Sequence, residues 1–169
     1  MTTSVLQDAF GHHVWATLTL LDVCRGLPPE RLDTTVPGTY GSILDTMRHL
    51  VGADASYLFV LTGGTAPRID EDAMNLDELR DAMVSFGDAW QGVLAGEIDP
   101  GRELTRNRDD GSSTRAPVSI RLSQALHHGT DHRSQICTAL TSIGVEPPFI
   151  DVWDYGLQDG RVIETEPTS

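Results

Sequence analysis

The sequence contains no lysine. All 12 of its basic residues are arginine, and 25 acidic residues give a formal net charge of −13 at pH 7. A charge of this sign and size repels nucleic-acid phosphates and anionic lipid headgroups, and no lysine-rich tail or patch reverses it locally. The composition therefore argues against a nucleic-acid partner. An arginine-only, Ala/Gly/Asp-rich sequence is also typical of bacterial proteins encoded by high-GC genomes.

Cysteine is scarce as well. Cys24 and Cys137 lie far apart, and neither belongs to a Cys-x-x-Cys or Cys-x-x-His pattern. Isolated thiols in apolar helical stretches usually behave as small buried hydrophobic residues. We predict that role for both cysteines, with a disulfide or a reactive thiol as the alternative.

Long apolar runs are missing too. No run approaches the roughly 20 residues that a membrane-spanning helix needs, and the N-terminus lacks a basic segment followed by an apolar one. We expect a soluble cytoplasmic protein that does not associate with membranes. A chain of 169 residues can bury a core without disulfides, so a single domain over residues 1–169 is expected.

What the sequence does contain is helical periodicity, interrupted by segments rich in proline and glycine. Ser42, followed by Asp45 three residues later, is typical of a capped helix start. Apolar residues recur at helical spacing in every stretch between the breaks, which predicts an all-α fold. The predicted helices run from about Ser4 to Arg25, Ile43 to Thr62, Asn75 to Ala95 and Val118 to Ile143.

Two segments fall outside these helices. Residues 103–116 contain Asp110-Gly111, a pair that closes tight turns, so a short irregular hairpin is predicted before the last helix. The C-terminal segment around Trp153 and Tyr155 is aromatic and too short to fold alone. We expect it to pack over the helices.

Histidines supply the most informative pattern. His128 and His132 are four residues apart, a spacing at which two imidazoles on one helix can reach the same metal ion. On the second predicted helix, His49 falls nearly opposite the main apolar stripe, which argues against a simple core role. Three such ligands leave one coordination position open for water or substrate, which is typical of catalytic metal sites.

Other interpretations of these residues stay open at this point. A His-x-x-x-His pair arises by chance in a chain with several histidines, and an inward histidine can simply donate to a backbone carbonyl. His13 lies in the apolar stripe of the first predicted helix, where that structural role is expected. Asp54 lies on the apolar face of the second, where it could bond to Arg133 or to a ligand histidine.

The chain resembles a known family in four segments that span nearly its whole length. In order they are Gly41-Ser42-Ile43, Arg48-His49-Leu-Val-Gly-Ala-Asp54, His128-x-x-x-His132-Arg133-Ser-Gln135 and Asp151-x-Trp153-x-Tyr155. This pattern resembles the DinB-like superfamily of metalloenzymes.

The resemblance implies a four-helix bundle with up-down-down-up topology, in which a long connection joins the second and third helices. It also implies a divalent metal held by three histidines, which fall here on His49, His128 and His132. Zinc is the metal most expected, and nickel or iron are alternatives. Members of the family are often homodimers, so a homodimer is expected.

The same resemblance indicates a function. Relatives include metal-dependent transferases and isomerases that use bacillithiol or mycothiol, and the high-GC composition favours mycothiol. The leading expectation is a metal-dependent thiol S-transferase that acts on a small electrophile. Arg133 and Gln135 would orient the second ligand or the cofactor, or else be solvated, and His13 would line the pocket as acid, base or extra ligand.

Two rival functions remain. Metal-activated water would make the protein a hydrolase. A non-catalytic, dimeric scaffold would use the metal only to hold helices together. A fourth protein ligand from His13, Asp45 or Asp54 would favour the scaffold, because structural metal sites usually fill all four positions.

Overall fold

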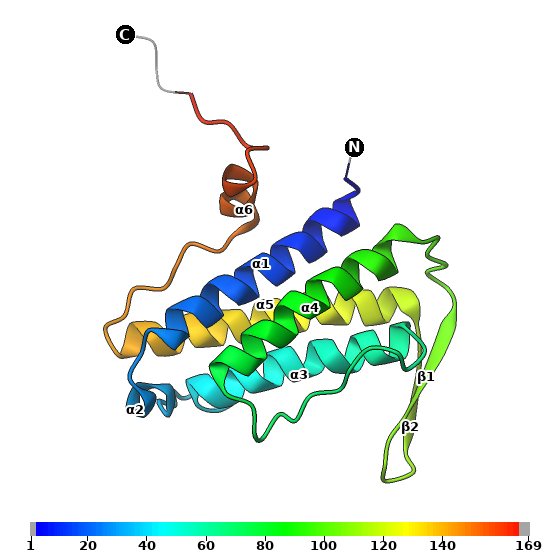
Figure 1. Cartoon of the computed structure of the whole chain (residues 1–169), viewed down its shortest axis with the longest axis horizontal. Helices are drawn as coiled ribbons and strands as arrows, with labels where there is room; N and C mark the ends of the chain where they lie inside the picture. Colours follow the sequence, from blue (N-terminus) through cyan, green and yellow to red (C-terminus); the bar gives the residue numbers. More distant parts are fainter. Residues whose placement is uncertain (1–2, 166–169) are drawn as a thin grey trace.

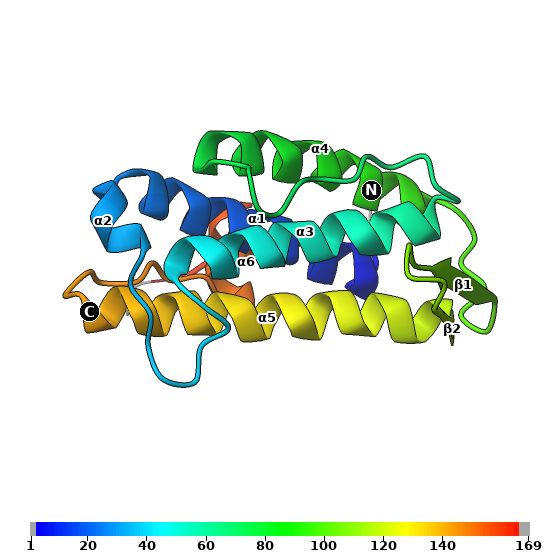
Figure 2. The ribbon, with the colours of Figure 1, turned by 90° about the horizontal axis from the view of Figure 1, so that it is seen from below.

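A computed structural model describes residues 3–165, and most of them are helical. The long helices α1 (Val5–Arg25), α3 (Ile43–Leu61), α4 (Leu76–Ala95) and α5 (Val118–Ser142) lie side by side (Figures 1 and 2). Short helices α2 (Pro29–Leu32) and α6 (Val152–Gln158) follow α1 and α5 respectively. The helical class predicted from the sequence is confirmed, although neither short helix was predicted.

Three of the long helices begin with the same local device. In each, the side chain of the residue before the helix accepts a hydrogen bond from the backbone N–H three residues later. The side chain of that later residue accepts one from the backbone N–H of the capping residue. This arrangement satisfies N–H groups that have no partner inside the helix. The predicted cap of α3 is confirmed. The pairs are Ser4 and Gln7, Ser42 and Asp45, and Asn75 and Glu78.

The predicted hairpin forms directly before α5. Strands β1 (Glu103–Asn107) and β2 (Ser113–Pro117) pair antiparallel, with Leu104 opposite Ala116. Gly111 closes the turn with a φ of +82°, a left-handed conformation that glycine adopts without strain. Because β2 ends at Pro117 and α5 begins at Val118, the hairpin fixes where the last long helix starts.

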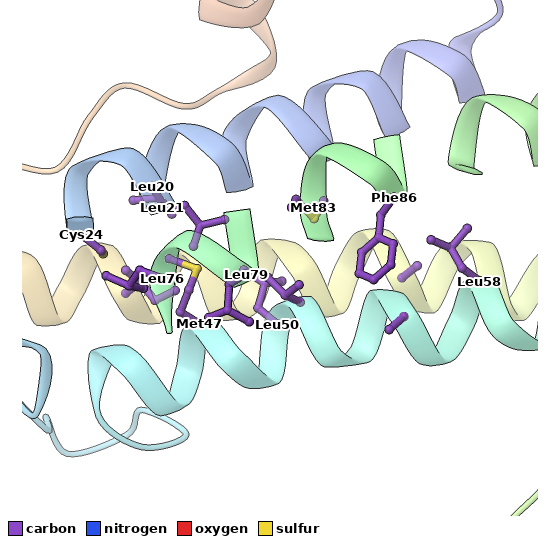
Figure 3. Close-up of a cluster of buried hydrophobic side chains, with 14 of the residues drawn as sticks. Leu20, Leu21, Cys24, Met47, Leu50, Leu58, Leu76, Leu79, Met83 and Phe86 are labelled. Atoms are coloured by element: carbon purple, nitrogen blue, oxygen red, sulfur yellow. The ribbon is translucent and has the colours of Figure 1, made fainter. Parts of the chain in front are cut away.

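The core fills the space between the long helices (Figure 3). Phe86 and Met83 of α4 meet the apolar faces of α1 and α3, and each is at most 1% exposed. Burial of such side chains contributes roughly 1.5–3 kcal/mol each. The other labelled members of this cluster are Leu20, Leu21, Cys24, Met47, Leu50, Leu58, Leu76 and Leu79.

Both cysteines are free thiols. Cys24 is completely buried, and burial raises the pKa of its thiol to about 12. Cys137 is partly buried and its pKa is also raised by burial. The thiols are therefore protonated and unreactive at neutral pH, as expected for small apolar residues.

The aromatic tail packs on the bundle only in part. Tyr155 of α6 lies against Gly11 of α1, where any larger residue would collide with its ring. Trp153 and Phe149 are instead 64% and 81% exposed, so for these two the predicted packing is wrong. Residues two apart on a helix point about 200° apart, so α6 cannot turn both Trp153 and Tyr155 toward the bundle.

Over residues 3–165, no helix combines the length and the apolar character needed to cross a bilayer.

Candidate metal centre

Three histidines from two helices meet between α3 and α5. His49 projects from α3, while His128 and His132 project from successive turns of α5. Their Nε2 atoms are close together, 3.2 Å from His49 to His128 and 3.1 Å from His128 to His132. His132 is 8% exposed and the side chain of His49 27%, so the cluster lies just below the surface.

These distances fit a shared metal ion. Zinc bound tetrahedrally to imidazole nitrogen at about 2.0–2.1 Å places its ligand atoms about 3.3 Å apart. Hydrogen bonds alone do not explain the cluster, since a ring nitrogen carries either one proton or one lone pair in its plane. The Nε2 of His128 has two close neighbours and can bond to one of them. A cation at the centre would satisfy all three nitrogens.

The electrostatics keep the ligands in the binding form. Burial, together with the neighbouring His132 and His49, lowers the pKa of His128 to about 4. Burial also lowers the pKa of His132. A low pKa leaves both rings neutral at pH 7, and neutral imidazole is the form that binds metals.

The outer ring nitrogens are held by two further side chains. Nδ1 of His132 lies 3.2 Å from Oε1 of Gln135, and Nδ1 of His49 lies 3.4 Å from Oε2 of Glu71. With Nε2 facing the centre, each Nδ1 carries the proton and donates to these oxygens. The predicted orienting role of Gln135 therefore has a geometric basis, whereas Glu71 was not anticipated.

Tyr40 is a third residue that holds the clustered histidines in position. Its ring stacks on His49 with centroids 4.0 Å apart and planes 7° from parallel. Its backbone N–H donates to the same Oε1 of Gln135, at 2.8 Å. Tyr40 therefore connects the two helices that carry the histidines. Sequence reasoning missed it, although it directly precedes the Gly41-Ser42 helix entry.

We predict that replacing Gln135 with leucine lowers metal affinity about 10–100-fold, the usual effect of removing a group that orients a metal ligand. The leucine leaves the Nδ1 proton of His132 without an acceptor, so the ring loses its fixed orientation. Competition with a chromogenic zinc chelator measures the change. Gln135→Glu, which keeps an acceptor oxygen, should retain most of the affinity. Equal affinities for both variants would contradict the role.

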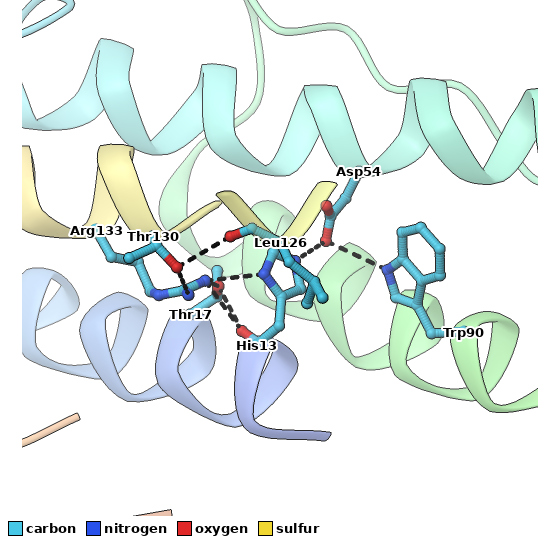
Figure 4. A network of polar contacts seen from close by, with 7 residues as sticks. All are labelled: His13, Thr17, Asp54, Trp90, Leu126, Thr130 and Arg133. Atoms are coloured by element: carbon cyan, nitrogen blue, oxygen red, sulfur yellow. Dashed lines mark hydrogen bonds and ion pairs between the residues drawn. The ribbon is translucent and has the colours of Figure 1, made fainter. Parts of the chain in front are cut away.

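The other candidate residues form a separate buried network (Figure 4). Nε2 of His13 lies 2.8 Å from Oδ2 of Asp54, and Arg133 Nη1 lies 2.9 Å from His13 Nδ1. Arginine can only donate, so Nδ1 accepts and the imidazole proton sits on Nε2, which donates to Asp54. Trp90 Nε1 donates to the same carboxylate oxygen at 3.4 Å.

This network corrects two expectations. Arg133 is 3% exposed and bonds to His13, Thr17 and Thr130, so it neither contacts the histidine cluster nor faces solvent. Burial lowers the pKa of its guanidinium to about 10, which leaves it charged at pH 7. His13 bonds to a carboxylate rather than to a backbone carbonyl, and it lies outside the cluster.

The expected fourth ligands are likewise engaged elsewhere. Asp45 accepts from the hydroxyl and the backbone N–H of Ser42, and Asp54 and His13 bond to each other. Within residues 3–165, His49, His128 and His132 form a three-membered cluster whose ligand atoms all lie within 4.8 Å of one another. The set could hold a divalent metal through three neutral nitrogens.

Comparison with known proteins agrees with this arrangement. The sequence model of the DinB family matches residues 1–164, nearly the whole chain. No curated protein matches the sequence. The match covers every helix and all three clustered histidines, and the chain belongs to the DinB family.

Proposed function

We propose that the protein is a metal-dependent thiol S-transferase. His49, His128 and His132 would hold a divalent ion, with zinc as the expected metal, and a low-molecular-weight thiol would take the open position. The observation that carries the proposal is the cluster itself, in which three Nε2 atoms converge without a fourth protein ligand among the described residues. Open three-histidine sites are typical of catalytic metals.

The three neutral ligands determine what the bound ion could do. A divalent ion held by these three neutral nitrogens would keep its full charge, and its chemical contribution would be to stabilise a thiolate at neutral pH. The protein supplies the geometry: Gln135 and Glu71 fix the ring orientations of His132 and His49, and Tyr40 covers one face of His49. The thiolate sulfur would then attack a small electrophile beside the open position.

The scaffold alternative has less support. It requires a fourth protein ligand. However, His13 and Asp54 bond to each other, and Asp45 accepts hydrogen bonds from Ser42. Hydrolysis through activated water uses the same open position and stays the rival among enzymes. The arginine-only composition supports mycothiol as the thiol, and the family supports a homodimer.

The proposal includes the up-down-down-up order of the long helices. A long connection, residues 62–75, joins α3 to α4, as this order requires. In Figure 1, α3 and α4 begin at the same end of the bundle, while α1 and α5 begin at the other. These directions support the order.

The test is a thiol screen on zinc-loaded protein. We expect mycothiol to displace chloride from 1-chloro-2,4-dinitrobenzene faster with the enzyme than without it, because the bound thiolate is the nucleophile. Liquid chromatography with mass spectrometry detects the S-conjugate, and bacillithiol, glutathione and cysteine serve as comparison thiols. The His128→Ala variant should lose the acceleration. Formation of the hydroxyl product instead would favour hydrolysis, and no acceleration with any thiol would defeat the transferase proposal.

A further inference from the structure

A groove of about 620 Å³ lies between α1, α5 and the segment 148–154. On α5 it is lined by Leu126, Thr130, Arg133, Ser134 and Cys137. At 100° per residue, these positions fall on the side of α5 opposite to His128 and His132. The groove is therefore separate from the candidate metal centre.

The outer wall of the groove is fixed in place. His12 Nε2 donates to the backbone carbonyl of Ile150 at 2.8 Å, which ties the segment to α1. At the far end, the side chain of Asp151 accepts the backbone N–H of Asp154 and begins α6. At the first of these anchors, Phe149 and Ile150 add apolar surface to the groove.

Arg133 brings an incompletely balanced charge to this groove. Its guanidinium bonds to three neutral side chains, those of His13, Thr17 and Thr130 (Figure 4). Asp54 is separated from it by the His13 ring and already accepts from Trp90. No carboxylate among residues 3–165 forms an ion pair with Arg133. Buried charges are usually paired directly, because an unpaired one is costly.

We propose that this groove binds a small apolar monocarboxylate, whose carboxylate bonds to Arg133 and whose apolar body lies against Leu126, Phe149 and Ile150. Guanidinium and carboxylate form charge-assisted hydrogen bonds that are stronger than neutral ones, particularly where water is excluded. Asp151 and Asp154 also line the groove, and their negative charge disfavours ligands with a second anionic group.

The first experiment compares two probes of equal shape, 4-phenylbutanoate and 4-phenylbutanamide, by two-dimensional NMR titration of the full chain. Because a hydrogen bond to a charged group contributes about 1.5–3 kcal/mol, we expect the carboxylate to bind roughly ten-fold or more tightly. Shifts should be largest at residues 9–13 and 148–154 and, on α5, at Leu126, Thr130, Arg133, Ser134 and Cys137, rather than at His128 and His132. Equal binding of the two probes, or shifts confined to the surroundings of His49 and His128, would overturn the proposal.

Variants locate the site. Ser134→Trp places a large side chain in the groove from an exposed position and should abolish binding. Ser123→Trp makes the same change three turns earlier on α5, at an exposed residue outside the groove, and should leave binding unchanged. Unaltered binding in Ser134→Trp would contradict the assignment.

A second pair of variants tests the charge and separates this site from the metal centre. Asp154→Asn removes a nearby negative charge and should tighten 4-phenylbutanoate binding, because repulsion is relieved. His49→Ala should leave that binding intact, whether or not the protein is a transferase. Weaker binding in Asp154→Asn, or loss of binding in His49→Ala, would overturn the proposal.

Discussion

Replacing any one of His49, His128 or His132 with alanine is expected to empty the metal centre. Purified protein should carry about one equivalent of divalent metal, and each variant should carry almost none. Each substitution leaves two imidazoles, and in residues 3–165 no further His, Cys, Asp or Glu joins the cluster to replace the lost nitrogen. Two neutral ligands do not hold zinc against the dilution and washing of a purification.

Elemental analysis of protein prepared without a histidine tag measures this effect. His127→Ala is the matched control, since His127 lies next to His128 on α5 but is exposed. It should keep its metal. The metal assignment would be wrong if all four variants retained metal equally, or if wild-type protein refolded with excess zinc, nickel or iron still bound none.

The second large effect concerns stability. Asp54→Ala should lower the free energy of unfolding by about 3–5 kcal/mol, because it leaves two buried donors without an acceptor and each costs roughly 1–3 kcal/mol. Asp54 is 2% exposed and His13 is completely buried. Without the carboxylate, His13 Nε2 and Trp90 Nε1 lose their acceptor, and the buried charge of Arg133 also loses the partial compensation that Asp54 gives it from beyond the His13 ring.

Urea denaturation followed by far-ultraviolet circular dichroism measures the loss. Asp22→Ala is the comparison, because Asp22 likewise accepts from two side chains, those of Arg25 and Arg80, but is 46% exposed. Solvent screens that pair, so the loss there should stay below about 1 kcal/mol. Similar losses in the two variants would show that the Asp54 network contributes no more than a surface ion pair.

Local sequence signals account for the parts of the fold that were predicted correctly. The cap at Ser42, the turn at Gly111 and the four-residue spacing of His128 and His132 all act within a turn or two of backbone. The placement of His49 away from its apolar stripe was visible for the same reason. A helical wheel shows which side of a helix a residue occupies.

The missed features depend on contacts between distant segments. Glu71 reaches His49 from the connection before α4, by lying across Gly52, where a larger residue would collide with it. Arg133 follows His132 in the sequence, yet one step of 100° turns it toward α1 and His13. A helical wheel cannot show which partner lies on the other side, so the bond from Arg133 to His13 could not be predicted.

The buried network draws one residue from each long helix: His13 from α1, Asp54 from α3, Trp90 from α4 and Arg133 from α5. Detaching any one of these helices would remove a hydrogen-bond partner from a polar or charged group that stays buried among the other three. Local opening of a single helix therefore carries a penalty close to that of global unfolding. The most protected amides of all four helices should exchange with solvent deuterium at similar rates, as one cooperative unit.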